Sequence, residues 1–233
     1  MKIYDRPGFP NPSRIRIVLS EKGLEDQIEF VSVDLIGAEH KQEPFLAMNP
    51  AGKIPVLELD DGTLISESTA ITEYLDNLDG HPVLTGKTPY EKAVIHMMQN
   101  RAEAELMGAV DGYFHYATPG LGSAMRPYVA PEWAGRKEWG ERQLAKAVRG
   151  MKYFDRVLKS RPFVAGNTFS MADITVFASL DFADAAAITI PDECKSLIAW
   201  RARVSNLPSV KNRTGKSFLP EDLKRLGLEP SRT

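Results

Sequence analysis

The residues with the clearest chemical potential are a proline-centred segment, residues 49–57, and the pair Glu67 and Ser68 that follows it. Proline lacks a backbone donor and pushes the preceding residue into an extended conformation. Ile54–Pro55 is therefore a candidate cis bond that leaves the Ile54 backbone free to pair with an extended peptide. Glu67 and Ser68 are expected to open a helix, where unpaired amides suit a carboxylate and the Glu67 side chain can hold an ammonium group. These groups predict a site for one small zwitterionic peptide.

The two segments resemble the glutathione-binding half of the cytosolic glutathione S-transferases in order and spacing. The resemblance includes the run Glu-His-Lys at 39–41, which precedes residues 49–57. It extends over nearly the whole chain, because a later segment around Ser170 and Asp173 also matches. Each short motif is weakly specific, whereas the combination is a strong signal. The expected class is a bacterial, Nu-like or theta-like member.

The resemblance implies how glutathione, the co-substrate, is held. The helix start is expected to hold the γ-glutamyl end, and the residue before the proline to pair its backbone with the cysteinyl amide. Three basic residues are expected near the glycyl carboxylate. The alternative interpretation of the basic residues is a charged surface loop in solvent. The residues expected to bind glutathione are His40, Lys41, Lys53, Ile54, Pro55, Glu67 and Ser68.

Catalysis requires a group that stabilises the glutathione thiolate. A free thiol has a pKa of about 8.5, and lowering it by two units requires roughly 2.7 kcal/mol, more than one neutral hydrogen bond supplies. Where the best-known members place Ser or Cys after the first strand, this chain has Phe9, which cannot donate. Asn11 resembles the asparagine of Nu-like members and is the expected catalytic residue, with Ser13 and Tyr4 as alternatives. Asn11 could instead serve as a helix N-cap before Pro12.

The electrophile is expected to bind above the thiol, against the helical half. Tyr113 and Tyr116, with Phe114, Met107 and Met125 nearby, lie close to an expected bend and would suit an apolar pocket. The alternative interpretation is core packing, which is more common for aromatic residues at helical spacing. Tyr113 and Tyr116 are therefore the candidates for the electrophile pocket.

Strand and helix patterns alternate through residues 1–79, which predicts a thioredoxin-like α/β domain. An apolar stripe that stops at Gly23 marks a first helix, and the turn signal Asp-Asp-Gly at 60–62 marks a hairpin. A second amphipathic helix follows Glu67. The expected strands are residues 2–4, 28–35, 56–59 and 63–66.

The rest of the chain is expected to be helical. Residues 80–89 contain prolines and glycines that interrupt every pattern, so they are expected to form a linker. Residues 90–233 are expected to form an all-helical bundle domain that carries the electrophile pocket and ends in a C-terminal tail. Long helices are expected at 90–116 and 139–159, and a capping-box pattern at 170–173 predicts the start of another.

Composition narrows the possible partners. The 29 basic and 31 acidic residues include no long basic run, so nucleic acid is not an expected partner. No apolar run approaches the length of a membrane span and no signal-peptide pattern is present, so the chain is expected to be cytoplasmic with no membrane partner. The single cysteine, Cys194, excludes an intramolecular disulfide and a cysteine cluster for zinc, and no metal is expected.

The expected function is that of a glutathione S-transferase that activates the glutathione thiolate for attack on small apolar electrophiles. The resemblance also implies a homodimer. An alternative enzyme is a glutathione-dependent disulfide or peroxide reductase in which two glutathiones supply all the sulfur chemistry. A third alternative, of another class, is a noncatalytic transferase-like interaction module. The sequence does not identify the electrophile.

Overall fold

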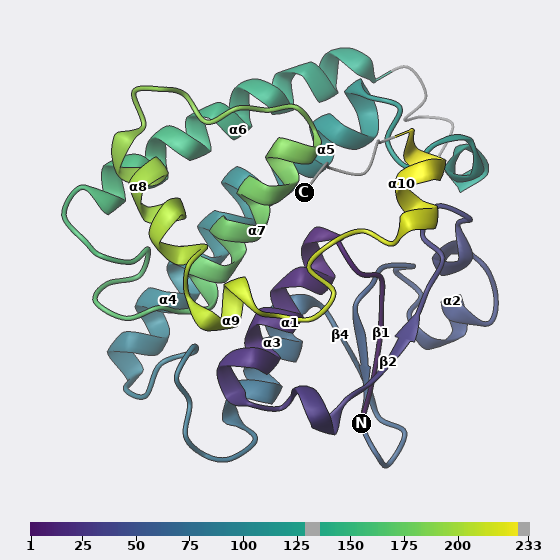
Figure 1. Cartoon of the computed structure of the whole chain (residues 1–233), viewed down its shortest axis with the longest axis horizontal. Coiled ribbons are helices and arrows are strands. Elements are labelled where there is room, and N and C mark those ends of the chain that lie inside the picture. Colours follow the sequence, from purple (N-terminus) through teal and green to yellow (C-terminus); the bar gives the residue numbers. More distant parts are fainter. Residues whose placement is uncertain (129–135, 228–233) are drawn as a thin grey trace.

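The computed structural model describes residues 1–128 and 136–227, which form a small α/β half followed by a larger helical half (Figure 1). The α/β half contains a four-stranded sheet with the strand order β2-β1-β3-β4. Strands β1 and β2 are parallel, whereas β3 is antiparallel to both β1 and β4. The strands are β1 Lys2–Asp5, β2 Glu29–Ser32, β3 Val56–Glu58 and β4 Leu64–Ser66.

Helices cover both faces of this sheet. Helix α1, Pro10–Lys22, and helix α3, Ser68–Asn77, lie on one side of it, and the short helix α2, Phe45–Met48, lies on the other (Figure 1). Helix α1 buries Ile15 and Leu19 in the main core and ends at Gly23, which adopts a left-handed conformation with φ 63°. The prediction of a thioredoxin-like α/β half with this order of elements is confirmed.

The helical half is built around one buried helix. Helix α7 is apolar on nearly every side and lies among the other helices, with its capping-box residues fully buried. The prediction of a helical second half is confirmed for the described residues. Its helices are α4 Pro89–Ala102, α5 Gly108–Ala117, α6 Lys137–Leu158, α7 Met171–Ala185, α8 Lys195–Val204, α9 Pro208–Lys211 and α10 Pro220–Leu226.

The single helix expected at 90–116 is interrupted. Between α4 and α5 the backbone forms a π-helical turn, Glu103–Met107. Helix α6 packs closely against this turn. A Cβ added at Gly150 would collide with the carbonyl oxygen of Glu105, so only glycine fits there. A π turn widens the helix locally and changes the direction in which its side chains point. The expectation of one regular helix is therefore wrong at this point.

The C-terminal segment returns to the α/β half. After α9 the chain passes the start of α1 and ends its described part with α10 near α2 (Figure 1). The N–H of Gly8 donates to the carbonyl of Gly215 at 3.0 Å, and a Cβ at Gly8 would lie 2.5 Å from the backbone of Phe218. The buried Arg6 forms an ion pair with Asp222 at 2.7 Å. The expected helical domain thus contributes part of the surroundings of the first strand.

The division of the chain at 1–79, 80–89 and 90–233 stays a prediction, and residues 129–135 and 228–233 of the last range lie outside the described residues. Within the described ranges, no helix is both long and apolar enough to cross a membrane. The same residues include no group of three or more His, Cys, Asp or Glu placed to hold a metal ion.

Candidate functional site

The sheet register brings three chain segments to one end of the sheet. Tyr4 pairs with Val56, and Val56 pairs with Ser66, so the end of β1, the start of β3 and the end of β4 are neighbours. The turn after β1 leads into α1, Ile54 and Pro55 precede β3, and α3 follows β4. The residues that the sequence singled out in these segments therefore surround one site.

The Ile54–Pro55 bond is cis, as predicted. The turn before it is held by Asn49, whose Nδ2 donates to the carbonyl of Lys53 at 2.8 Å while its Oδ1 accepts from the N–H of Ala51 at 3.2 Å. Ladder pairing begins at Val56. In the described part of the chain, the backbone N–H and C=O of Ile54 take part in no hydrogen bond, so both remain available to an extended peptide.

The basic residues lie beside this turn. His40 and Lys41 belong to a short 3-10 helix, and the Nζ of Lys41 donates to the carbonyl of Gly52 at 2.7 Å, whereas Lys53 is exposed. His40 is 5% exposed, and its Nδ1 is buried without a hydrogen-bond partner in the described structure. Burial, with Lys41 and His115 nearby, lowers the pKa of His40 to about 4. His40 is therefore a neutral, buried imidazole close to the ammonium group of Lys41.

Helix α3 begins without a side-chain cap. Glu67 occupies the N-cap position, yet its carboxylate forms no capping hydrogen bond and is exposed. Its backbone has φ 70° and ψ 118°, a conformation that costs a non-glycine residue about 1 to 3 kcal/mol and occurs preferentially at functional sites. Ser68, the first helical residue, is buried. The uncapped amides of the first turn and the free Glu67 carboxylate offer opposite charges to a ligand.

Helix α1 begins two residues earlier than the capping interpretation of Asn11 requires. Phe9 is the N-cap and Pro10 is the first helical residue, so the interpretation of Asn11 as an N-cap is wrong. Both Pro10 and Pro12 satisfy the first turn because neither has a backbone N–H, and a sequence with two such prolines is ambiguous. The N–H of Ser13 donates to the carbonyl of Phe9 at 2.9 Å. Asn11 therefore carries the one backbone N–H at the start of α1 that the helix does not use.

The Asn11 side chain is oriented by Arg14. Its Oδ1 accepts from the Nη1 of Arg14 at 3.1 Å, which leaves the Nδ2 hydrogens as donors on the other side of the amide. The hydroxyls of the two alternative donors differ in their hydrogen bonds, because Ser13 accepts one and Tyr4 donates one. The hydroxyl of Ser13 accepts from Arg213 at 3.0 Å. The hydroxyl of Tyr4 donates to Glu58 at 2.6 Å, an interaction that raises the pKa of Tyr4 to about 12.

A buried polar network joins Asn11 to the helical half. Arg14 is 3% exposed and forms an ion pair with Glu103, the first residue of the π turn, at 2.6 Å. The same Glu103 oxygen accepts from the Nε2 of Gln99, which also donates to the hydroxyl of Thr69 in the first turn of α3. The starts of α1 and α3 are thus held relative to each other by residues from α4 and the π turn.

One face of α5 is turned toward the α/β half. Phe114 packs against the cluster that contains Phe9 and Ile54. His115 lowers the pKa of His40, and Asp111 acts to raise that of Lys41, so both charges lie within electrostatic reach of the basic residues. Asp111 and His115 are also paired, with 3.4 Å between carboxylate and imidazole.

The two tyrosines expected in the electrophile pocket have different surroundings. Tyr116 contacts Trp139 of α6, with ring centroids 5.1 Å apart in an edge-on arrangement. Tyr113 is half-buried and packs against the main core. Phe114 is the aromatic residue of α5 that packs against the cluster containing Phe9 and Ile54, together with Met125 of the following segment.

Sequence reasoning missed the Asp111 and His115 pair and the Arg14 network. The four-residue spacing of Asp111 and His115 places them on one helix face and was a usable signal. Arg14 and Glu103 are far apart in the chain, and no spacing rule connects them. Cys194 is buried in the helical half, where burial raises the pKa of its thiol, so it contributes nothing to this site.

Comparison with known proteins identifies the family. A profile of the glutathione S-transferase N-terminal domain matches residues 10–78, and one of the C-terminal domain matches residues 137–203. The chain is 56% identical over 211 residues to glutathione S-transferase 2 of Saccharomyces cerevisiae, covering 91% of this chain and 88% of that protein.

Solved structures give the same result. The crystal structure of Gtt2 from Saccharomyces cerevisiae superposes with a TM-score of 0.86 at 57% identity, covering 91% of this chain and 99% of that one. A glutathione S-transferase domain-containing protein from Marinobacter aquaeolei superposes with a TM-score of 0.83 at 50% identity, covering 90% and 100%. With its thioredoxin-like half, its helical half and the open polar groups between them, the chain belongs to the cytosolic glutathione S-transferase family.

Proposed function

We propose that this protein conjugates glutathione to small apolar electrophiles. The supporting observation is that the Ile54 backbone and the start of α3 with Glu67 carry polar groups without hydrogen-bond partners among the described residues, next to the basic residues His40 and Lys41. Glutathione has amides, an ammonium and two carboxylates besides its thiol. The Ile54 backbone suits an amide, Glu67 the ammonium, the start of α3 one carboxylate and the basic residues the other. Family membership and the 56% identity to the yeast transferase support the same activity.

Each group then has a role in binding. The Glu67 carboxylate holds the ammonium, and the amides at Ser68 hold the adjacent carboxylate. The backbone of Ile54, turned outward by the bond to Pro55, pairs with the cysteinyl residue. The glycyl carboxylate lies toward His40, Lys41 and Lys53, the last through its exposed ammonium.

We assign the stabilisation of the thiolate to the start of α1. The Nδ2 of Asn11 and the backbone N–H of the same residue are two donors in one place. A neutral hydrogen bond contributes about 0.5 to 1.5 kcal/mol and the helix start about 0.3 to 1 kcal/mol, so together they reach the range that a thiol pKa shift of one to two units requires. The imidazole of His115, paired with Asp111, offers a place for the thiol proton. Asn11 is also the residue that carries the resemblance to Nu-like members.

The electrophile pocket is formed in this proposal by the α5 face that looks toward Phe9. Phe114 and Met125 supply apolar surface there, and Leu121 belongs to the same cluster. Tyr113 stays a candidate at the edge of this surface. Tyr116 fits the pocket less well because its ring packs on α6.

The test is a pair of assays on the purified protein. Conjugation of glutathione to a chloronitrobenzene is measured beside glutathione-dependent reduction of hydroxyethyl disulfide. Conjugation as the dominant activity is the expected result. Dominant disulfide reduction would favour the reductase alternative, and glutathione binding with neither activity would favour the noncatalytic module.

A homodimer and a cytoplasmic location remain predictions. The dimer is supported by apolar residues on one face of α4, where Tyr90 is 78% exposed and Met97, seven residues on, is 46% exposed. Sedimentation is expected to show twice the chain mass of 25.9 kDa, and Met97→Glu is expected to favour the monomer. A wild-type protein that sediments as a monomer at micromolar concentration would contradict this prediction.

A further inference from the structure

The carboxylate of Glu103 connects the starts of α1 and α3. Its Oε1 lies 2.6 Å from the Nη2 of Arg14 and accepts from the Nε2 of Gln99 at 3.2 Å. The same Nε2 donates to the hydroxyl of Thr69, in the first turn of α3, at 3.0 Å. One carboxylate of the helical half therefore holds Arg14 directly and holds the start of α3 through one side-chain amide.

Arg14 is a buried cation within reach of two carboxylates. It is 3% exposed, and its Nη1 donates to the Oδ1 of Asn11 at 3.1 Å. Burial lowers the pKa of Arg14, whereas Glu103 and, to a smaller extent, Glu67 act to raise it. A buried cation without a carboxylate partner is strongly unfavourable, so without Glu103 the guanidinium would be drawn to Glu67. While Glu103 holds Arg14, the Glu67 carboxylate stays available to a ligand.

The surroundings of Glu103 have features that are common at functional sites. Glu103 is the first residue of the π turn, and π turns occur frequently at such sites. Gln99 is 2% exposed, and its Oε1 is buried without a partner in the part of the chain that the structure describes. An unpaired buried acceptor is destabilising. The amide of Gln99 thus keeps its two donor contacts, to Glu103 and Thr69, at the expense of its oxygen.

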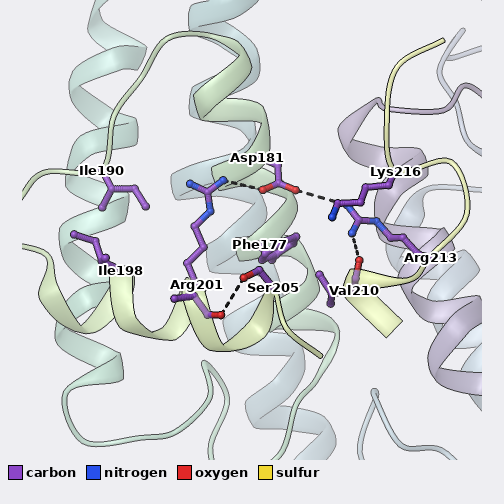
Figure 2. Close-up of a pocket in the computed structure, with 10 residues that line it drawn as sticks. Phe177, Asp181, Ile190, Ile198, Arg201, Ser205, Val210, Arg213 and Lys216 are labelled. Carbon is purple, nitrogen blue, oxygen red and sulfur yellow. Dashed lines mark hydrogen bonds and ion pairs between the residues drawn. The ribbon is translucent and has the colours of Figure 1, made fainter. Parts of the chain in front are cut away.

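Arg213 also reaches the first turn of α1 and provides a structural comparison. It follows α9, and Figure 2 shows it joined to Asp181 of α7, 3.7 Å away. Its guanidinium donates to the hydroxyl of Ser13 through Nε and Nη2, at 3.2 and 3.0 Å. Among the described residues, two buried arginines therefore form hydrogen bonds in this turn, and the one that contacts Asn11 is Arg14.

We propose that Glu103 is a positioning residue for glutathione conjugation. Through Arg14 it orients the amide of Asn11 toward the sulfur, and it keeps the guanidinium away from Glu67, so that Glu67 can pair with the ammonium group. Glu103 itself contacts neither the sulfur nor the electrophile. The inference rests on the proposed function and adds to it a group of the helical half that prepares both ends of the glutathione site.

Positioning and a direct charge effect predict opposite shifts of the thiol pKa. Removal of a negative charge near the sulfur lowers the thiol pKa, because the thiolate is repelled less. Loss of the orientation of Asn11 raises it by about 0.5 to 1 unit, because one neutral donor is lost. Glu103→Gln keeps the size of the side chain and removes its charge. The direction of the shift in this variant therefore distinguishes the two effects.

The test measures two quantities on the full-length protein. The thiol pKa of bound glutathione is obtained from thiolate absorbance against pH, and the Kd for S-methylglutathione, which has no thiol, from titration calorimetry. Glu103→Gln is expected to raise the thiol pKa by about 0.5 to 1 unit. It is also expected to raise the Kd about tenfold, because Arg14 then competes for Glu67. In Asn11→Ala protein the same substitution should raise the thiol pKa by less than about 0.2 unit, because Asn11 is already absent.

A second variant keeps the test decisive if Glu103→Gln does not fold. Arg14→Gln combined with Glu103→Gln removes both charges, so no buried cation is left unpaired. The thiol pKa is expected to stay raised by about 0.5 to 1 unit, because Arg14 no longer holds Asn11. The Kd for S-methylglutathione is expected to return to within about twofold of the wild-type value, because no cation competes for Glu67.

Two controls separate positioning from stability. Glu105→Gln removes an exposed carboxylate of the same π turn, 4.0 Å from Lys146, and is expected to change neither quantity. Asp181→Asn weakens the ion pair that holds Arg213 at the start of α1. It is expected to lower stability in urea unfolding without changing the thiol pKa of bound glutathione.

The outcomes that contradict the inference are distinct from those that contradict the proposed function. An unchanged or lowered thiol pKa in Glu103→Gln, or in the double variant if the single one does not fold, would overturn the inference alone. So would full additivity with Asn11→Ala, or a pKa shift of the same size in either control. An unchanged Kd in Glu103→Gln would overturn the part that concerns Glu67. A wild-type protein whose bound glutathione keeps an ordinary thiol pKa of about 8.5 would overturn the proposed function and the inference together.

Discussion

The first turns of helices α3 and α7 begin in opposite ways. Helix α7 is closed by a capping box, in which Ser170 and Asp173 satisfy each other's backbone. The Asp173 carboxylate also accepts from the N–H of Val164 at 2.8 Å and the indole of Trp200 at 3.2 Å. Helix α3 has Glu67 at the N-cap, with no capping hydrogen bond and a positive φ.

The two helix starts therefore differ in what they can contribute, one to stability and the other to ligand binding. A helix start whose donors are satisfied internally contributes to stability and has nothing left for a ligand. A helix start that leaves its amides open forgoes that stability and can bind an anion. The closed start lies in the buried core of the helical half, whereas the open one lies at the end of the sheet. The comparison therefore predicts that substitutions at the two starts have separable effects.

The largest effect is expected at the closed start. Asp173→Ala leaves the donors of Val164, Ser170 and Trp200 buried without an acceptor and is expected to lower the free energy of unfolding by about 4 kcal/mol. Urea unfolding at pH 7 measures the change. Asp184→Ala on the same helix, whose carboxylate is exposed, is the control and should change stability by about 0.5 kcal/mol or less. Equal losses in the two variants would remove the distinction.

The open start should show the reverse. Glu67→Gln removes the charge that we propose holds the ammonium group, so the Kd for glutathione is expected to rise about thirtyfold, or about 2 kcal/mol. Stability should stay within about 0.5 kcal/mol, because the carboxylate caps nothing. Calorimetric titration with glutathione measures the first quantity and urea unfolding the second. Glu73→Gln, farther along α3, is the control; a loss of binding there as large as at Glu67 would count against the assignment.

His40 makes the free energy of unfolding depend on pH. Its pKa of about 4 lies below the ordinary value of about 6.5, so the unfolded chain binds more protons in this range and stability is lost as pH falls through it. Between pH 7 and pH 5, this residue is expected to account for about 2 kcal/mol of lost stability. His40→Gln should show that much less decline in urea unfolding between the two pH values. Parallel declines in the two proteins would exclude His40 as the source.

The smallest effect is expected at the start of α1. This start is intermediate between the open start of α3 and the closed start of α7. Asn11→Ala removes one neutral donor, so the thiol pKa of bound glutathione is expected to rise by about 0.5 to 1 unit. Stability should change by less than about 1 kcal/mol, because Asn11 does not cap the helix and Arg14 keeps its ion pair with Glu103. Thiolate absorbance against pH is the measurement.

Asn11→Asp completes this test. The carboxylate keeps an acceptor for Arg14 but replaces the donor with a negative charge, so the thiol pKa should rise further than in the Ala variant. An unchanged pKa in both variants would move the role to the backbone of the turn or to His115.

The open start of α3 and the closed start of α7 could both be predicted from the sequence. The capping box spans four residues, the cis Ile54–Pro55 bond follows from a proline ahead of a strand, and the uncapped Glu67 follows a short strand after a hairpin turn. In each case the interacting residues are close in the chain, so spacing and residue type carry the information.

Contacts between segments far apart in the chain could not be predicted from the sequence. The Arg14–Glu103 pair depends on a π turn that no local pattern announces, and the Arg213 contact with Ser13 joins residues 200 positions apart. The start of α1 was misplaced for a different reason: Pro10 and Pro12 are both suitable first residues, and the choice between them depends on how Phe9 packs. Tertiary packing decides such cases.

The Arg6–Asp222 pair also bears on how the protein is made. Arg6 is synthesised long before residues 221 and 222, and it is 7% exposed in the folded protein. Besides Ser32, its hydrogen-bond partners are Glu221 and Asp222. Until residues 221 and 222 have been synthesised, this cation lacks both of these carboxylate partners and stays hydrated. The turn after β1 therefore reaches its final packing only after residues 221 and 222 have been made, although its own residues are made much earlier.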